Sequence, residues 1–201
     1  MPVEDPIAVT RQWVRDFVIG LNLCPFAKKP FDAGRIRFVA TDVEGEGDLL
    51  EVLDMELKLL ATSPREAIET TILIHPRALL DFLDYNDFLH AANRRLKNLG
   101  YAGVIQIASF HPRYQFADTT PDDVTNYTNR SRYPMLHLLR EESITEVAGN
   151  PEVLAGIPGR NVELLRNMRP ETVRRLTRTS TAPSAPGSAD PIPGPSRSTP
   201  G

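Results

Sequence analysis

Three of the chain's four histidines stand where a strand or a helix is expected to begin or end. His75 and His111 each follow an apolar run of strand length, and His137 comes shortly after Pro134, where a helix is expected to begin. Ligand sites in open α/β sheets gather beyond the carboxyl ends of the strands. His111 and His137 are therefore candidates for a catalytic general base.

Glu141 extends this set to a candidate metal site. It follows His137 by four residues and would share a face of the expected helix with it. This spacing suits two ligands of one ion, or a base and its orienting carboxylate. A divalent metal held by His75, His111, His137 and Glu141 is thus a candidate cofactor, and Glu141 is a candidate catalytic residue. The alternative is that each histidine binds a backbone carbonyl and stabilises a loop.

The single cysteine, Cys24, is a further catalytic candidate, as a thiolate nucleophile. Lys28 and Lys29 lie nearby in the sequence, and positive charge favours a thiolate. The immediate neighbours in LNLCPFA are apolar, however, and unpaired cysteines are among the most buried residue types. The competing interpretation is a small hydrophobic residue of the core.

The segment 111–140 concentrates polar side chains that could bind an anionic ligand. Arginine presents a planar fork of donors to a carboxylate or phosphate, and amides and phenols fix the orientation of what it binds. The candidate ligand-binding residues are Arg113, Tyr114, Asn126, Asn129, Arg130 and Arg140. A long surface loop held down by Asx-turns and by arginine–carboxylate pairs would use the same residue types, so both interpretations stay open.

The elements that would position these residues alternate between strand and helix patterns. Strands are expected over 35–43, 70–75 and 104–110, and amphipathic helices over 49–60 and 82–99, the latter ended by Gly100. Further helices are expected from Pro6, with Asp5 as its N-cap, to Gly20, from 134 to 147 and over 162–168. The predicted fold is α/β: a small, mostly parallel sheet of three or slightly more strands with flanking helices and extra N- and C-terminal helices. A ferredoxin-like α+β arrangement is the alternative.

Composition sets the wider limits. The 201 residues, with a formal net charge of -3, suit one globular domain over 1–177, followed by a Pro-, Ser- and Gly-rich tail over 178–201 that is expected to be disordered. The charge argues against a broad nucleic-acid surface. A lone cysteine and a proline-broken, charged N-terminus favour a cytoplasmic protein, and no apolar run is long enough to cross a membrane.

Four segments together are similar to a known family. They are GLNLCPFAKK, ETTILIHPRALLDFLDYNDFL, QIASFHPRYQF and NYTNRSRYPMLHLLREESI. They resemble the uncharacterised family known as domain of unknown function 1415, over about residues 6–168. The resemblance implies membership of this family and carries no activity with it.

These observations favour a small hydrolase or group-transfer enzyme that acts on an anionic substrate in a pocket lined by His, Arg and Glu. The alternative is a non-catalytic module that binds an anionic ligand or a protein partner. The sequence leaves the oligomeric state open.

Overall fold

The computed structural model describes residues 4–148 and 151–177, so the tail predicted over 178–201 lies outside the described residues. The chain begins with α1 (Pro6–Trp13), which continues as a π-helical segment (Val14–Ile19). There follow α2 (Lys28–Asp32), β1 (Ile36–Ala40), α3 (Glu46–Thr62), β2 (Thr70–Ile74), α4 (Phe82–Asn98), β3 (Ile105–Phe110) and a 3₁₀ turn (Val124–Thr128). The last elements are β4 (Met135–Arg140), α5 (Glu141–Ala148), α6 (Pro151–Arg166) and α7 (Pro170–Thr177).

The sheet is mixed, with strand order β1-β2-β4-β3. β1 and β2 are parallel neighbours, whereas β4 is antiparallel to both β2 and β3. The predicted α/β class is confirmed, but the expectation of a mostly parallel sheet is wrong. The ferredoxin-like alternative is wrong too, because its β-α-β-β-α-β sequence of elements differs from the β-α-β-α-β-β sequence found here.

The connection from β3 to β4 explains the reversal of direction. It contains only a short 3₁₀ turn and no crossover helix, so β4 can return antiparallel to β3. The sequence 135–140 was expected to open a helix, and that prediction is wrong. Its apolar run MLHLLR fits either state locally, and pairing with both β2 and β3 makes it a strand. The helix begins only at Glu141.

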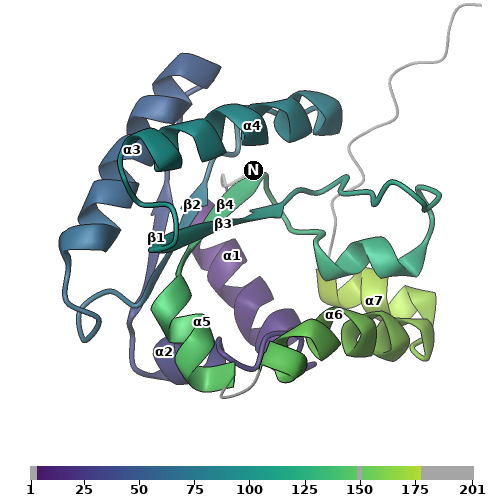
Figure 1. The fold of residues 1–201 in the computed structure, drawn as a ribbon. Helices are drawn as coiled ribbons and strands as arrows, with labels where there is room; N and C mark the ends of the chain where they lie inside the picture. Colours follow the sequence, from purple (N-terminus) through teal and green to yellow (C-terminus); the bar gives the residue numbers. More distant parts are fainter. Residues whose placement is uncertain (1–3, 149–150, 178–201) are drawn as a thin grey trace, which may run out of the picture.

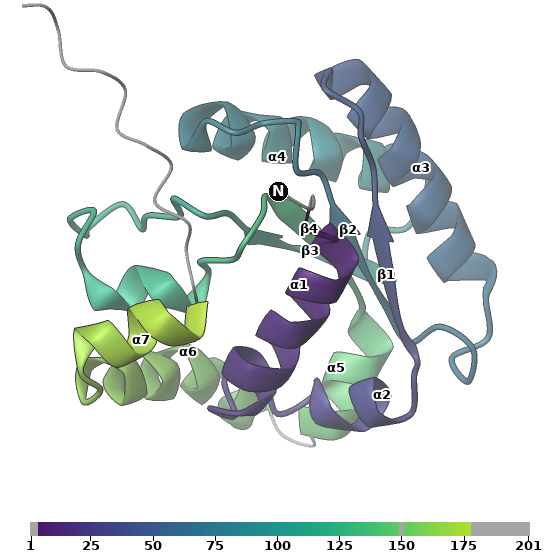
Figure 2. The same cartoon turned by 180° about the vertical axis from the view of Figure 1, so that it is seen from behind.

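Helices cover both faces of the sheet. α3 and α4 pack on one face (Figure 1). In the core on that face, leucines of α3 and Tyr85 and Phe88 of α4 meet Leu73 and Leu136. α1 crosses the other face, with α2 and α5 beside it and α6 and α7 beyond (Figure 2). Side chains alternate between the two cores along each strand, as the pleat requires.

Several predicted helix ends are confirmed. The Asp5 side chain accepts a hydrogen bond from the Ile7 amide at 3.0 Å, and Gly100 has the positive φ of a left-handed cap. The first helical run ends at Gly20, where a Cβ would lie 2.3 Å from the Asp16 carbonyl oxygen. The helix predicted over 162–168 is the second half of α6. No helix in the described part of the chain is long and apolar enough to span a membrane.

Candidate functional site

A cavity of about 650 Å³ lies on the sheet face that α1 covers. Its floor includes one row of side chains across three strands, Ile72 on β2, His137 on β4 and Ala108 on β3, which the strand register places directly opposite one another. The volume falls within the range of about 300–1,000 Å³ that is typical of small-molecule sites. This cavity is therefore the candidate functional site.

The walls come from elements far apart in the sequence. Val14 and Val18 of the π-helical segment and the turn around Cys24 line one side, and residues of α5 and α6 such as Ile144 and Ile157 line another. π-helical turns are rare, and they occur frequently at functional sites. Most of the lining is apolar, so the cavity favours an apolar body in whatever it binds.

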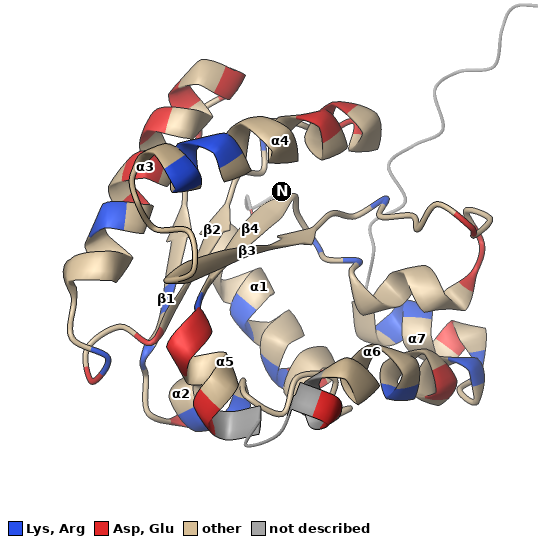
Figure 3. Ribbon diagram, viewed as in Figure 1, with Lys and Arg blue, Asp and Glu red and all other residues tan. Residues whose placement is uncertain are grey.

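One end of the cavity is charged. Arg65 donates to Glu146 at 2.8 Å and to Glu69 at 3.2 Å, and Arg35 reaches Glu69 at 3.3 Å. Burial opposes the ionisation of Glu69, but the Ser143 hydroxyl and the charges of Arg65 and Arg35 lower its pKa overall. Basic and acidic residues meet where β4 runs into α5 (Figure 3).

His137 is held in one orientation by a bond to the neighbouring strand. Its Nε2 lies 2.8 Å from the Thr70 hydroxyl, and that hydroxyl lies 2.5 Å from the carbonyl oxygen of Leu138. A carbonyl only accepts, so the single Thr70 proton is donated to Leu138. Thr70 must then accept from Nε2–H, and the acceptor lone pair of His137 lies on Nδ1.

The Nδ1 atom of His137 has no hydrogen-bond partner among the residues that the structure describes, and the ring is partly exposed toward the cavity. Surrounding protein lowers the pKa of the imidazole from 6.5 to about 4 by desolvation. At neutral pH the ring is thus uncharged and able to accept a proton or a hydrogen bond from a ligand.

Cys24 lines the same cavity as His137. Burial raises the pKa of its thiol, although the amides of Phe26 and Ala27 and the charge of Arg160 oppose this. The residue is a protonated thiol at neutral pH, and the environment is not one that generates a standing thiolate.

His75 and His111 lie on the opposite face of the sheet, against α4. Their rings pack on Tyr85 with centroid distances of 5.9 and 5.0 Å. His75 Nδ1 donates to the Ala78 carbonyl at 3.0 Å. His111 accepts from the Arg113 amide through Nδ1, so its Nε2–H donates to the Leu79 carbonyl at 3.2 Å. Both bonds hold the segment 76–81, in which Leu79 has a positive φ of 56°.

The four residues considered as metal ligands are not brought together. His75 and His111 lie on one face of the sheet, His137 lies on the other, and Glu141 begins α5 rather than following His137 on a shared helix. No group of three or more His, Cys, Asp or Glu side chains suited to a metal occurs within the described residues.

The polar residues of the loop bind the loop itself and the segments beside it. The Asn126 side chain bonds Phe116, Thr119 and Thr120, and Asn129 donates to the Ser109 carbonyl. Arg130 donates to the Tyr114 and Pro121 carbonyls while stacking over Tyr127, and Arg113 reaches the Leu80 carbonyl and Asp81. These contacts support the structural interpretation of Arg113, Tyr114, Asn126, Asn129 and Arg130, none of which lines the large cavity.

Arg140 borders the large cavity, but its guanidinium serves another purpose. It donates to the carbonyls of Leu60, Ser63 and Ile68 at 2.7, 2.6 and 3.1 Å. Two of these carbonyls lie at the carboxyl end of α3, where positive charge is favoured by the helix dipole. Arg140 therefore caps the carboxyl end of α3 and links it to the residues just before β2.

Sequence reasoning missed Thr70, Arg35, Arg65 and Glu69. Thr70 was visible as a hydroxyl at the start of an otherwise apolar strand, but only the pairing of β2 with β4 shows that it faces His137. Arg35 directly precedes β1, and Arg65 and Glu69 precede β2, in segments whose sequences match no functional motif.

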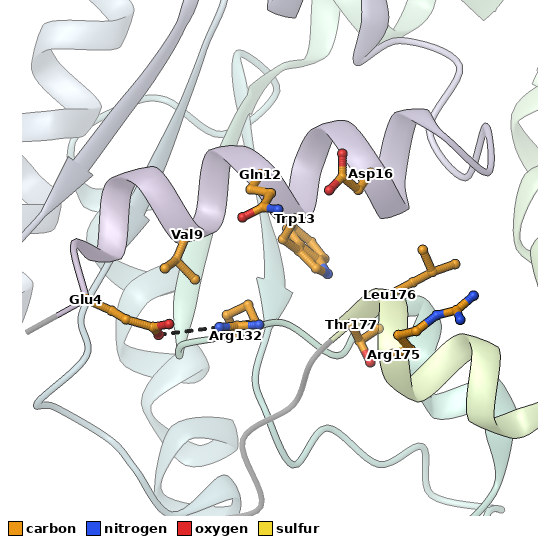
Figure 4. A pocket seen from close by; sticks show the side chains of 9 residues that line it. All are labelled: Glu4, Val9, Gln12, Trp13, Asp16, Arg132, Arg175, Leu176 and Thr177. Atoms are coloured by element: carbon orange, nitrogen blue, oxygen red, sulfur yellow. Dashed lines mark hydrogen bonds and ion pairs between the residues drawn. The ribbon is translucent and has the colours of Figure 1, made fainter. Parts of the chain in front are cut away.

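A second cavity, of about 250 Å³, lies between α1 and α7 (Figure 4). The ion pair between Glu4 and Arg132, 3.4 Å long, lies at one end of it, and Arg175 and Thr177 line the other. Trp13 lines both cavities and so forms part of the wall between them.

A family model described as "Protein of unknown function (DUF1415)" matches residues 5–175 of the chain. No curated protein and no solved structure matches the chain.

Proposed function

Since the chain belongs to the DUF1415 family, whose description names no function, we propose one from the large cavity itself. The protein is a small-molecule enzyme, a hydrolase or group-transferase, that acts in the cytoplasm on a largely apolar substrate carrying an anionic group. The observation that carries the proposal is the uncharged His137 ring at the floor of the cavity, whose Nδ1 bonds none of the residues that the structure describes.

His137 is the proposed general base. Nδ1 takes a proton from water, or from the hydroxyl of an acceptor substrate, as that oxygen attacks an acyl carbon. The C–O bond to the leaving group then breaks, and the imidazolium returns the proton to the leaving oxygen. Thr70 acts as a positioning residue, because accepting Nε2–H keeps the lone pair on Nδ1.

An anionic substrate supports this role energetically. A negative charge in the cavity favours the imidazolium and so raises the pKa of His137 from its low value in the free protein, by an amount that falls with distance from the ring. The base then becomes stronger when substrate is bound, and proton transfer is coupled to binding.

The second candidate is a module that binds the same molecule without proton transfer. It is favoured by the partner of His137, which is a threonine hydroxyl rather than a carboxylate, so the imidazolium gains no countercharge from Nε2. Both candidates use the same cavity, and they differ in what happens to the ligand.

The test is turnover of a panel of p-nitrophenyl esters whose acyl chains end in a carboxylate, measured by release of nitrophenolate. His137→Asn keeps an acceptor near Nδ1 but removes the base, so we expect kcat to fall by about 10²–10⁴-fold with KM little changed. Ala108→Trp, which fills the floor of the cavity, should abolish turnover, and Arg77→Ala, an exposed change outside the cavity, should not affect it.

Equal kcat for the His137→Asn variant and the wild type would refute the role of His137. If Ala108→Trp blocks the fluorescence of bound anilinonaphthalene sulfonate while no ester in the panel is turned over, the non-catalytic candidate replaces the enzyme.

A further inference from the structure

We propose that the substrate is an amphipathic monocarboxylate, with its head at Lys29 and Arg35 and its apolar chain over the sheet. This inference deepens the proposed function and rests on it, since it names the substrate class of the same cavity. It also assigns the anion-binding role to residues that the sequence had not suggested.

The first step is the balance of charge in the cavity. The lining carries four basic side chains and two carboxylates: Lys29, Arg35, Arg65 and Arg140 against Glu69 and Glu146. Lys29 is exposed and Arg35 half-buried, so the excess positive charge lies toward the mouth of the cavity rather than in its buried part. A ligand that brings negative charge therefore complements this lining, and a cationic ligand does not.

The second step identifies which of the cations are available. Arg140 is occupied by three backbone carbonyls, and Arg65 is occupied by Glu146 and Glu69. Arg35 has one contact with a carboxylate, a 3.3 Å bond from one of its terminal nitrogens to Glu69. Lys29 pairs with no described residue.

The lack of a partner is particular to Lys29 and is not shared by the neighbouring lysine of α2. Lys28 lies 2.5 Å from Asp32 one turn later, so its charge is already compensated. Lys29 and the free donors of Arg35 are thus the two groups able to bind an anionic head, and together they suit a single carboxylate.

The third step concerns the opposite end of the cavity. Beyond His137 along the sheet the lining includes Phe110 and Met135, which pair with each other, and Trp13, whose ring lies 5.7 Å from that of Phe110. A chain of methylenes or an aromatic tail would complement this surface, because burying apolar area there contributes about 25 cal/mol per Å².

The sheet register relates the position of Arg35 to that of His137. Arg35 directly precedes Ile36, which pairs with Thr70, and Thr70 pairs with Leu139. His137 is two residues further along β4, a step of about 7 Å. β2 separates β1 from β4, which adds two strand spacings, about 10 Å, across the sheet. A substrate with its carboxylate at Arg35 therefore needs an extended chain to bring a bond beside Nδ1 of His137.

The test compares three ten-carbon compounds below their micelle concentrations: decanoate, decanol and decyltrimethylammonium. Binding is followed by displacement of anilinonaphthalene sulfonate from the full-length protein. Charge-assisted hydrogen bonds predict that decanoate binds about tenfold or more tightly than decanol, and that the cation binds most weakly.

The variant Lys29→Gln/Arg35→Gln should lower decanoate affinity to that of decanol and leave decanol unchanged. Its matched control, Lys28→Gln/Arg77→Gln, removes the same charge outside the cavity lining and should keep the preference for decanoate.

Two outcomes would overturn the inference. If decanol binds as tightly as decanoate and Ala108→Trp blocks both, the cavity binds apolar molecules without a carboxylate head, and the proposed general base is untouched. If no ten-carbon compound binds, the substrate class is wrong, and ester turnover by the wild type still decides the proposed function separately.

Discussion

Acid should destabilise this protein in a narrow pH window through its buried histidines. Burial lowers the pKa of His75 from 6.5 to about 4, with the nearby His111 acting in the same direction. Burial likewise lowers the pKa values of His111 and His137 to about 4. Between pH 6.5 and pH 4 the unfolded chain binds more protons than the folded chain, so the free energy of unfolding falls as the pH falls.

His75 gives the clearest magnitude because its side chain is fully buried. At pH 5 the solution is 1.5 units below the unfolded-state pKa of 6.5 and still above the folded-state value. Each unit is worth about 1.4 kcal/mol, so this one histidine should cost the protein about 2 kcal/mol between pH 8 and pH 5. Glu69, Asp81 and Asp123 have lowered pKa values, and their contribution is lost only below about pH 4.5.

The assay is urea unfolding at pH 8, 7, 6 and 5, followed by the fluorescence of the single tryptophan, Trp13, which is buried. His75→Asn keeps a donor near Nδ1 for the Ala78 carbonyl but cannot titrate. Its loss of stability between pH 8 and pH 5 should be smaller than that of the wild type by about 2 kcal/mol. His90→Asn, at an exposed position of α4, is the control. An unchanged pH dependence in His75→Asn would refute the reasoning.

Three further predictions concern packing and access. Tyr85→Phe should lower the free energy of unfolding by about 2–3 kcal/mol, because it leaves one backbone amide and one carbonyl without their partner; urea unfolding at pH 8 checks this. Gly20→Ala should cost about 1–3 kcal/mol because its Cβ meets the Asp16 carbonyl, whereas Gly47→Ala, with open space around it, should stabilise by about 0.5 kcal/mol in the same measurement. Because burial raises the pKa of Cys24, its alkylation by iodoacetamide should still accelerate above pH 9.0, and saturating decanoate should slow it; a plateau near neutral pH would contradict this.

The sequence predicted the elements whose signals are local. Asp5 with Pro6 marks a helix start, Gly100 marks a helix end, and the leucines of α3 repeat at helical spacing. Each of these depends on a few neighbouring residues, so the structure confirms them.

The strand at 135–140 depended on partners that the local sequence does not contain. Its residues have no helix breaker and no strict alternation, and β2 and β3 supply the hydrogen bonds that decide its state. The wrong prediction of a helix at 135–140 also led to the wrong partner for His137. A helix would have paired His137 with Glu141, whereas in the strand His137 faces Thr70. Thr70 and His137 are 67 residues apart, and only the sheet register relates them.

The position of β4 also bears on how the protein is made. It is the last strand among the described residues, yet it lies between β2 and β3, so the first three strands alone leave a gap where two rows of hydrogen bonds should form. A nascent chain that has not yet emerged past residue 140 cannot close its sheet, and pairings between residues so distant in sequence form slowly. His137 arrives with this final strand. A partly synthesised chain would therefore lack the residue proposed as the general base of the cavity.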